Sequence, residues 1–336
     1  MKASFRTLAA GALLCLASAQ ASAITVLGSF AFSGTPGLEM DINPNGDLVY
    51  IAGGMGQSGL IRVNASNPLA MSQVGIGPGG GGVAVDPGTG RFATTVGGSF
   101  FIYNSNLSTH FSSGIPGCGG SVVSGGGLFG VNTQCFDHFS LFSQAPGLVF
   151  QQPLGGVGGQ VGYNPATGNF YSRVNNSTRV ITPSLTTSTI GGVFTIANGV
   201  TNRLYGGNSA NQIDVIDGNT HGLIGSISLT AGGALPAVSS LLNQVYAIDS
   251  GQIKVFDGAT HALLQTLALP NGYLPYSLEA AHLDDRLYVL ASKPGNPNAL
   301  FVLDASAAPV AGTLWLMLAG LLGLLGFAGR APRFAS

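Results

Sequence analysis

The chain has 336 residues, of which 45% are hydrophobic and only 7% are charged, and its formal net charge is −1. Because an average soluble domain is about 25% charged, this composition excludes a disordered polyelectrolyte and a nucleic-acid-binding protein with a basic face. The 53 glycines show no three-residue period, which excludes collagen, and the length suffices for one large domain or two ordinary ones.

The first 23 residues have the layout of a secretory signal peptide. Lys2 and Arg6 precede an apolar run over residues 8–19, and small residues stand at 21–23, where a signal peptidase cuts. We therefore expect cleavage after Ala23 and an exported protein. A buried N-terminal helix is the alternative interpretation of the same segment.

The middle of the chain, residues 24–304, contains a repeat of about forty residues that occurs seven times. One row of the repeat is a Gly- or Asn-containing turn followed by an apolar pair, as in Gly46-Asp-Leu48 and Asn243-Gln-Val245. A second row marks the end of a later strand, and its seven positions are Asn64, Asn104, Ser143, Thr182, Asp217, Asp257 and Asp304. Each unit contains four short β-like runs, which in unit six cover residues 236–241, 244–249, 252–257 and 263–269.

A four-stranded antiparallel sheet that repeats seven times closes into a β-propeller. Unit seven supplies only three strands, whereas an isolated strand-like segment stands at Thr25–Phe32. We expect this segment to pair with residues 299–303 and close the ring. The predicted fold class is therefore all-β, a seven-bladed β-propeller closed by its N-terminal strand.

The repeats resemble those of the secreted YVTN-type seven-bladed propellers, most clearly at residues 211–220 (Asn-Gln-Ile-Asp-Val-Ile-Asp-Gly-Asn-Thr) and 251–260 (Gly-Gln-Ile-Lys-Val-Phe-Asp-Gly-Ala-Thr). The resemblance extends over residues 24–304 and is strongest in units five to seven. It implies a fold that serves binding modules and enzymes alike, so it does not by itself assign an activity.

Two cysteines remain once the signal segment, which contains Cys15, is removed. An even pair in an oxidising compartment predicts a disulfide between Cys118 and Cys135. A reactive thiol is the alternative, although neither cysteine stands in a Cys-x-x-Cys pair or beside a base.

Asp41 and Glu279 fall at equivalent positions on the first strands of units one and seven, which closure of the ring makes neighbours. Two carboxylates near the central channel could hold a cation or act on a bound sugar; the structural alternative is that each forms a hydrogen bond to a neighbouring blade or faces solvent. Residues 41–47 also copy the first ligand spacing of a calcium loop, but Ala52 stands where such a loop needs glutamate. Ca²⁺ is the cofactor to test, and the simple alternative is a turn between two strands.

The C-terminal segment, residues 305–336, contains an uncharged stretch over 305–329 followed by Arg330 and Arg333. A run of this length is long enough to cross a bilayer, and basic residues beyond it favour the cytoplasmic side. The segment resembles the PEP-CTERM family of C-terminal sorting signals in Pro309, in its Leu- and Gly-rich stretch and in its basic end. The resemblance implies a sorting transpeptidase of the exosortase type in a Gram-negative bacterium that exports polysaccharide. No Pro-Glu-Pro is present, so an ordinary single-span anchor stays open.

Within residues 24–304 there are 8 basic and 13 acidic residues, a net charge of −5, so nucleic acid is not an expected partner. No nucleophile elbow or metal-binding histidine pair is present. We expect a non-catalytic binding or structural module of the cell envelope or extracellular matrix, with polysaccharide or a surface protein as partner and the membrane contacted through the C-terminal helix. The alternative is a propeller enzyme, lactonase-like or quinone-dependent-dehydrogenase-like, with Asp41 and Glu279 as its metal or acid–base site.

Overall fold

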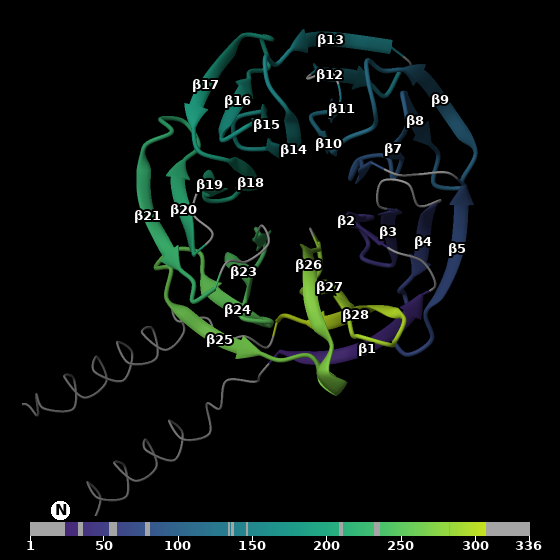
Figure 1. Ribbon diagram of the computed structural model, residues 1–336, viewed down its shortest axis with the longest axis vertical. Coiled ribbons are helices and arrows are strands. Elements are labelled where there is room, and N and C mark those ends of the chain that lie inside the picture. Colours follow the sequence, from purple (N-terminus) through teal and green to yellow (C-terminus); the bar gives the residue numbers. More distant parts are fainter. Residues whose placement is uncertain are drawn as a thin grey trace, which may run out of the picture.

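Seven four-stranded antiparallel sheets stand around a central axis in the computed structural model of the protein (Figure 1). The structure describes residues 24–306 except 33–35, 54–58, 78–80, 134, 136–137, 146, 208–210, 232–235 and 282. The prediction of an all-β, seven-bladed propeller is confirmed. In each blade the strands follow one another from the axis outward, and blade seven takes its outer strand from the N-terminus.

The four strands of a blade have distinct places. The inner strands are β2 (Pro36–Ile42), β6 (Val83–Val85), β10 (Val122–Gly125), β14 (Gly158–Asn164), β18 (Phe194–Asn198), β22 (Ala237–Ser239) and β26 (Leu274–Ala280). The second strands are β3 (Leu48–Gly53), β7 (Phe92–Val96), β11 (Leu128–Asn132), β15 (Asn169–Val174), β19 (Arg203–Gly206), β23 (Gln244–Asp249) and β27 (Arg286–Ser292). The third strands are β4 (Leu60–Asn64), β8 (Ser99–Tyr103), β12 (His138–Ser143), β16 (Ser177–Ile181), β20 (Gln212–Asp217), β24 (Gln252–Asp257) and β28 (Asn298–Asp304). The outer strands are β5 (Ser72–Gly77), β9 (Thr109–Gly114), β13 (Gly147–Pro153), β17 (Thr187–Gly191), β21 (Leu223–Ser228), β25 (Leu263–Leu267) and, in blade seven, β1 (Thr25–Phe32). A 3₁₀ turn, η1 (Pro270–Gly272), precedes β26.

The turns between inner and second strands explain why the repeat is visible in the sequence. In six blades a residue of this turn has a positive φ, as at Gly46 (70°), Gly168 (72°), Asn202 (50°) and Asn243 (50°). Glycine and asparagine adopt this left-handed conformation at the lowest cost, so the turn chemistry recurs wherever a blade begins its second strand. The alignment made from the sequence places the first apolar residue of the pair one position too early in blades one and three. In the structure, Val49 and Phe129, rather than the residues before them, occupy the position that Phe92 has in blade two.

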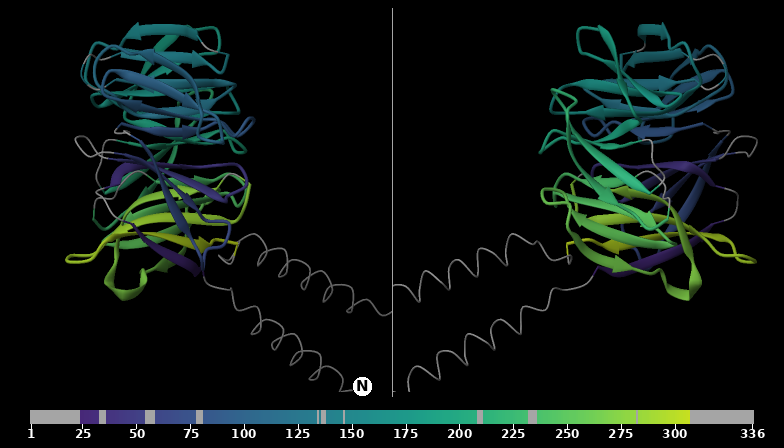
Figure 2. Two further views of the ribbon diagram at one scale, coloured as in Figure 1. Left: turned by 90° about the vertical axis from the view of Figure 1, so that its right-hand side faces the viewer. Right: turned by 60° about the vertical axis from the view of Figure 1, so that its left-hand side comes forward.

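The ring closes as predicted, through the N-terminal strand. Strand β1 pairs antiparallel with β28 from Thr25 opposite Asp304 to Phe32 opposite Asn298. In Figures 1 and 2 the purple β1 lies against the yellow β28, so the two ends of the domain form one sheet. Phe32 is 2% exposed and belongs to the apolar cluster between blades seven and one.

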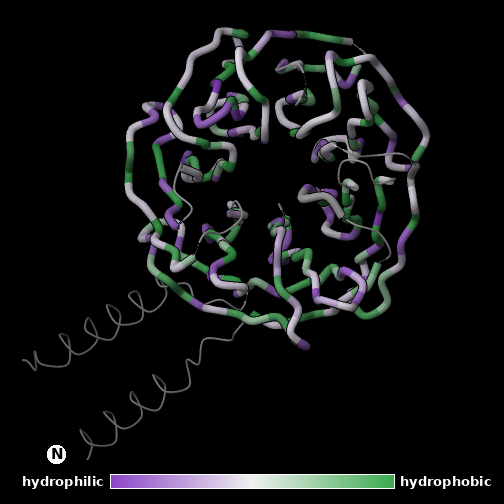
Figure 3. The backbone as a smooth tube through the Cα atoms, in the orientation of Figure 1, coloured by the Kyte–Doolittle hydropathy of each residue, from purple (hydrophilic) through white to green (hydrophobic). Residues whose placement is uncertain are grey.

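Apolar side chains fill the spaces between neighbouring blades rather than one central core. Figure 3 shows hydrophobic residues distributed around the whole ring. The largest fully buried side chains include Tyr50, Tyr171, Tyr205, Tyr246 and Tyr288, each on a second strand. Three of these tyrosine hydroxyl groups donate to a backbone carbonyl of the next blade: Tyr171 to Gly218, Tyr205 to Gly258 and Tyr288 to Gly46. The rings thus bury apolar area while their hydroxyl groups join one blade to the next.

Two asparagine pairs make similar ties. Asn164 Nδ2 donates to Asn202 Oδ1 at 2.7 Å, and Asn198 Nδ2 donates to Asn243 Oδ1 at 3.0 Å. Each pair joins the end of one inner strand to the turn of the following blade. Because Asn202 and Asn243 are also the left-handed turn residues, one side chain serves both the turn and the interface.

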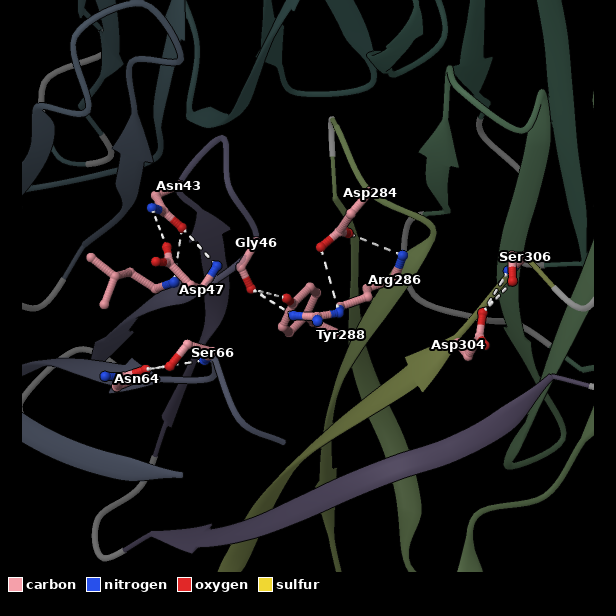
Figure 4. A network of polar contacts seen from close by, with 11 residues as sticks. Asn43, Gly46, Asp47, Asn64, Ser66, Asp284, Arg286, Tyr288, Asp304 and Ser306 are labelled. Carbon is pink, nitrogen blue, oxygen red and sulfur yellow. Dashed lines mark hydrogen bonds and ion pairs between the residues drawn. The ribbon is translucent and has the colours of Figure 1, made fainter. Parts of the chain in front are cut away.

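The joint between blades seven and one carries further polar contacts, which Figure 4 displays. The Gly46 carbonyl accepts from the Tyr288 hydroxyl and, at 3.3 Å, from Arg286 Nη1. Asp284 holds the same arginine through an ion pair of 3.5 Å. The two contacts of the Gly46 carbonyl connect segments that are about 240 residues apart in the sequence.

The predictions for the two ends of the chain lie outside the described residues. These are the signal segment with its cleavage after Ala23, and the tail beyond residue 306 with Pro309, Arg330 and Arg333. Within the part of the chain that the structure describes, no helix is long and apolar enough to span a membrane.

Replacing Phe32 by Ala should lower the free energy of unfolding by about 3 to 5 kcal/mol, because it opens a cavity at the closure of the ring. Chemical denaturation followed by tyrosine fluorescence measures this. Val26→Ala is the control, since Val26 lies on the same strand but is 39% exposed, and it should change stability by about 0.5 kcal/mol or less. Equal effects of the two substitutions would show that closure does not depend on this contact.

Candidate functional site

A cavity of about 770 Å³ lies on the axis and is lined by side chains from all seven inner strands. Its wall is mostly aliphatic and hydroxyl-bearing, with Gln160, Tyr163 and Tyr276 among the larger polar groups. Its charged lining residues are Glu39, Asp41, Asp86, Glu279 and Arg173. A concave, largely preformed space of this kind is where a propeller of this size would hold a ligand.

The structure places Asp41 and Glu279 in the wall of this cavity, on neighbouring blades. Asp41 is paired with Tyr50, and Glu279 is paired with the equivalent Tyr288 in blade seven. The equivalence that the repeat predicts is therefore correct. The charge of Asp41 acts on Glu279 strongly enough to change its pKa, so the two carboxyl groups belong to one electrostatic unit.

Sequence reasoning missed a third member of this cluster, Glu39. It lies two residues before Asp41 on β2, and residues two apart in a strand lie on the same face. That spacing was the signal that could have identified it. Glu39 accepts hydrogen bonds from Ser121 and from the backbone of Val83 and Val122, so its side chain reaches blades two and three.

Burial governs the protonation of these groups. Burial raises the pKa of Glu39 to about 7, with a smaller contribution from the charge of Asp41, although the hydrogen bonds that Glu39 accepts oppose the change. Burial and then the charges of Asp41 and Glu39 raise the pKa of Glu279 well above its ordinary value. Near neutral pH, Glu39 is therefore divided between its two forms, and Glu279 keeps its proton to a higher pH than an exposed glutamate does.

The oxygen atoms of Asp41 are used by backbone groups. Asp41 Oδ1 accepts from the Ile42 N–H and Oδ2 accepts from the Val85 N–H, each at 2.7 Å, so the carboxylate joins blade one to blade two. Glu39 makes a parallel tie, and Gly82 leaves room for it, because a Cβ at Gly82 would overlap Glu39 Oε2. These carboxylates are part of the framework of the ring.

The residues present do not fit a calcium site. In the loop with calcium-like spacing, Asn43 Oδ1 accepts from the N–H groups of Asp47 (3.1 Å) and Leu48 (2.8 Å), and Asn43 Nδ2 donates to Asp47 Oδ1. These side chains close a turn, as the alternative interpretation proposed. Among the described residues, no group of three or more His, Cys, Asp or Glu side chains could hold a metal ion.

Cys118 and Cys135 form a disulfide, in agreement with the prediction, and their Cα atoms are 5.3 Å apart. Cys118 precedes β10 and Cys135 follows β11, so the bond joins two loops at one end of blade three. Cys118 stands three residues before Ser121, whose hydroxyl contacts Glu39. The disulfide therefore anchors the segment that holds one of the cavity carboxyl groups.

Glu39→Gln should make the stability of the protein less dependent on pH. A pKa raised from 4.5 to about 7 means that the folded state binds this proton more tightly than the unfolded state. That contribution is complete below pH 4.5 and is lost as the pH rises through 7; it amounts to at most about 3 kcal/mol. Thermal unfolding at several pH values compares the variants, with Asp285→Asn, outside the cavity wall, as control. An unchanged pH profile for Glu39→Gln would contradict this assignment.

Replacing both Cys118 and Cys135 by Ser should destabilise the domain by about 3 kcal/mol, because the unfolded chain regains the freedom of the open loop. Denaturation of the wild type with and without a reductant provides the matched comparison. If reduction leaves the wild type unchanged, the bond does not form in solution.

The sequence matches no family model and no curated protein. Among solved structures, it is similar to the β-propeller domain of Cps50 (Swd1) from Myceliophteria thermophila, with a TM-score of 0.66 and 10% identity. The match covers 84% of this chain and 99% of the other. At this identity the likeness shows the fold alone, and the fold that it shows is a β-propeller.

Proposed function

We propose that the protein is an exported, non-catalytic binding module of the cell envelope or extracellular matrix. Its central cavity would take part of a neutral, hydroxyl-rich polymer, with polysaccharide as the first class to test and a surface protein as the second. The signal segment before residue 24 and the PEP-CTERM-like tail would bring it to this location, and a sorting transpeptidase of the exosortase type would act on the tail.

The observation that carries this proposal is the use of the cavity carboxylates as ties between blades. Asp41 accepts from Val85 of the next blade, and Glu39 accepts from Val83 and Val122 of the next two. An acid that acts on a substrate must reach it, whereas these groups hold backbone amides. Apart from Asp86, Arg173 and Glu279, what remains for a ligand is an uncharged wall with aromatic and amide side chains, which suits sugars.

Tyr276 is the residue best suited to contact such a ligand. Tyr276 is one of the residues that line the cavity, and its ring packs against the cluster between blades seven and one, where its hydroxyl lies. That hydroxyl is buried and has no hydrogen-bond partner among the described residues. A buried polar group without a partner costs free energy, which a sugar hydroxyl would recover if the Tyr276 hydroxyl turned toward the cavity on binding.

The disulfide supports the location. Disulfides persist in oxidising compartments and are rare in the cytosol, and Cys118 and Cys135 are bonded. The low charge of the chain suits contact with neutral polymers rather than with nucleic acid.

The second candidate function is that of an acid–base enzyme, and one observation supports it. A carboxyl group with a pKa of about 7 can donate and accept a proton at neutral pH, and Glu39 lies in the same cavity wall as Glu279, whose pKa burial also raises. Hydrolysis of a lactone is the reaction that such a pair could assist. No metal is needed for this form of the alternative.

The test is the melting temperature of the full chain, in mild detergent, against dextran, cellohexaose, alginate and simple lactones. A ligand that binds the folded state raises the melting temperature by mass action. At a free ligand concentration of a hundred times Kd, the free energy of unfolding increases by about 2.7 kcal/mol. Tyr276→Phe should reduce the shift caused by the bound sugar without lowering the melting temperature of the free protein. Tyr273→Phe, which removes a hydroxyl bonded to Pro297 outside the cavity wall, is the matched control.

The outcomes separate the two candidates. A shift with a polysaccharide that depends on Tyr276 supports the binding module. Lactone turnover that Glu39→Gln abolishes, with no sugar-induced shift, would replace it by the enzyme. If no carbohydrate or surface protein binds, the proposed function is wrong.

A further inference from the structure

Both ends of the propeller lie on one face of the ring. Thr25, at the start of β1, is paired with Asp304, and Asp304 is paired with Arg286 at the start of β27. Because the strands of a blade alternate in direction, the turns from inner to second strand and from third to outer strand lie at this same end in every blade. Arg203 Nη1 joins two such turns across a blade boundary, since it donates to the Ala259 carbonyl at 3.2 Å. We call this end of the ring the exit face.

Three neighbouring blades present an aliphatic side chain at the tip of a turn on the exit face. Val200 of blade five, Leu241 of blade six and Leu283 of blade seven are 75%, 55% and 67% exposed. The turns do not require these side chains. In blade four a turn closed by the same side-chain hydrogen bond, of 3.0 Å in both blades, has Ala166 where blade five has Val200.

Further exposed aliphatic side chains lie near this face in the same part of the ring. Those in blades five, six, seven and one are Val26, Leu69, Leu223, Ile224 and Leu263. Leu148 and Val149, in blade three, stand apart. On the opposite face, the large hydrophobic side chains that the described residues expose are Val157 and Leu274. Apolar side chains that gather on one face mark a contact surface, whereas single scattered ones do not.

The tail of the chain leaves the ring beside this group of side chains. The Ala305 N–H donates to the Asp285 carbonyl at 2.6 Å, which fixes the start of the tail two residues from Leu283. The uncharged run begins here and extends over residues 305–329. About 20 residues cross a bilayer, so about five of this run remain outside it, and they reach at most about 18 Å. A tail that crosses the bilayer therefore holds the exit face close to the headgroups.

We propose that the exit face of blades five, six, seven and one rests on a lipid bilayer, with its aliphatic turn tips in the headgroup region. This inference rests on the proposed location, because it takes the tail as a membrane anchor. The tail alone fixes only a distance. The turn tips add an orientation, since burial of Val200, Leu241 and Leu283 among lipids favours this side of the ring over any other.

The charges of the exit face select the kind of lipid. In blades five to seven, the described part of this face carries two arginines, Arg203 and Arg286, and five aspartates, Asp217, Asp257, Asp284, Asp285 and Asp304. An excess of negative charge is repelled by anionic lipids over a distance of about 10 Å at 0.1 M salt. The expected surface is therefore one of zwitterionic headgroups, such as phosphatidylethanolamine.

This orientation leaves the opposite face free for a ligand. Arg173 and Tyr276 line the cavity toward that face, because β15 ends there and β26 begins there. A ligand would therefore enter the axial cavity from the end that carries these two residues.

Tryptophan fluorescence of the full chain in vesicles tests the orientation, with lipids brominated close to the headgroup as the quencher. The vesicles contain phosphatidylethanolamine and phosphatidylcholine. Leu241→Trp reports the exit face in a Trp315→Phe background, which removes the only tryptophan of the chain. Leu274→Trp in the same background is the matched control, since Leu274 is 52% exposed on the opposite face. We expect quenching of Leu241→Trp that Leu274→Trp does not show, and equal quenching of the two would overturn the proposal.

Trp315 of the wild type reports the tail separately. If Trp315 is quenched but Leu241→Trp is not, the anchor stands and the orientation is wrong. If neither is quenched, the proposed location and the orientation both fail. An emission of Leu241→Trp that shifts to shorter wavelength as the protein is concentrated in detergent, without vesicles, would assign the exit face to a second copy of the chain instead.

Two changes test the contact itself. Val200→Ser together with Leu283→Ser should reduce the quenching of Leu241→Trp, because two of the three turn tips become polar, whereas Val157→Ser on the opposite face should not. Phosphatidylglycerol in the vesicles should weaken the quenching of Leu241→Trp and leave that of Trp315 unchanged. Circular dichroism confirms that each variant is folded. Quenching of Leu241→Trp that both sets of serine variants leave intact, or that anionic lipid strengthens, would refute the contact.

Discussion

The pairing of β1 with β28 is the constraint on which the rest of the structure depends. A single four-stranded sheet has two faces to bury and cannot bury either alone, so each blade relies on the blades beside it. In a ring every blade has two neighbours, but only if the two ends of the chain meet. The N-terminal strand supplies that meeting, and the apolar clusters between blades, the tyrosine ties and the cavity on the axis all follow from it.

The low charge of the chain shapes how the blades are joined. Only two ion pairs are found within the described ranges, and many of the polar contacts between blades are hydrogen bonds that tyrosine and asparagine side chains donate or that carboxylates accept. Such bonds have short reach and defined geometry, so they fix the blades relative to one another. The carboxyl groups at the centre are consequently held in low-polarity surroundings, and the raised pKa of Glu39 is the electrostatic result of this architecture.

Much of the fold could be predicted from the sequence because its repeated features are local. A left-handed turn requires Gly or Asn within a few residues, and unit six shows two strands with the bounds that the sequence predicts, Gln244–Asp249 and Gln252–Asp257. Less of the candidate site could be predicted from the sequence. Asp41 and Glu279 could be matched by repeat position, but the contacts of Glu39 with Ser121 and Val122 depend on how three blades pack. The ends of the chain, with Ala23 and Arg330, lie outside the described residues and stay predictions.

The closure also has a consequence for how the protein is made. Strand β1 leaves the ribosome first, yet its partner β28 begins only at Asn298. For most of synthesis, therefore, an uncharged and unpaired strand is exposed, and contacts of such long sequence separation form slowly. The last step of folding is the arrival of the oldest segment beside the newest. In a chain built in this way, the seventh blade cannot be completed until nearly the whole domain has been made.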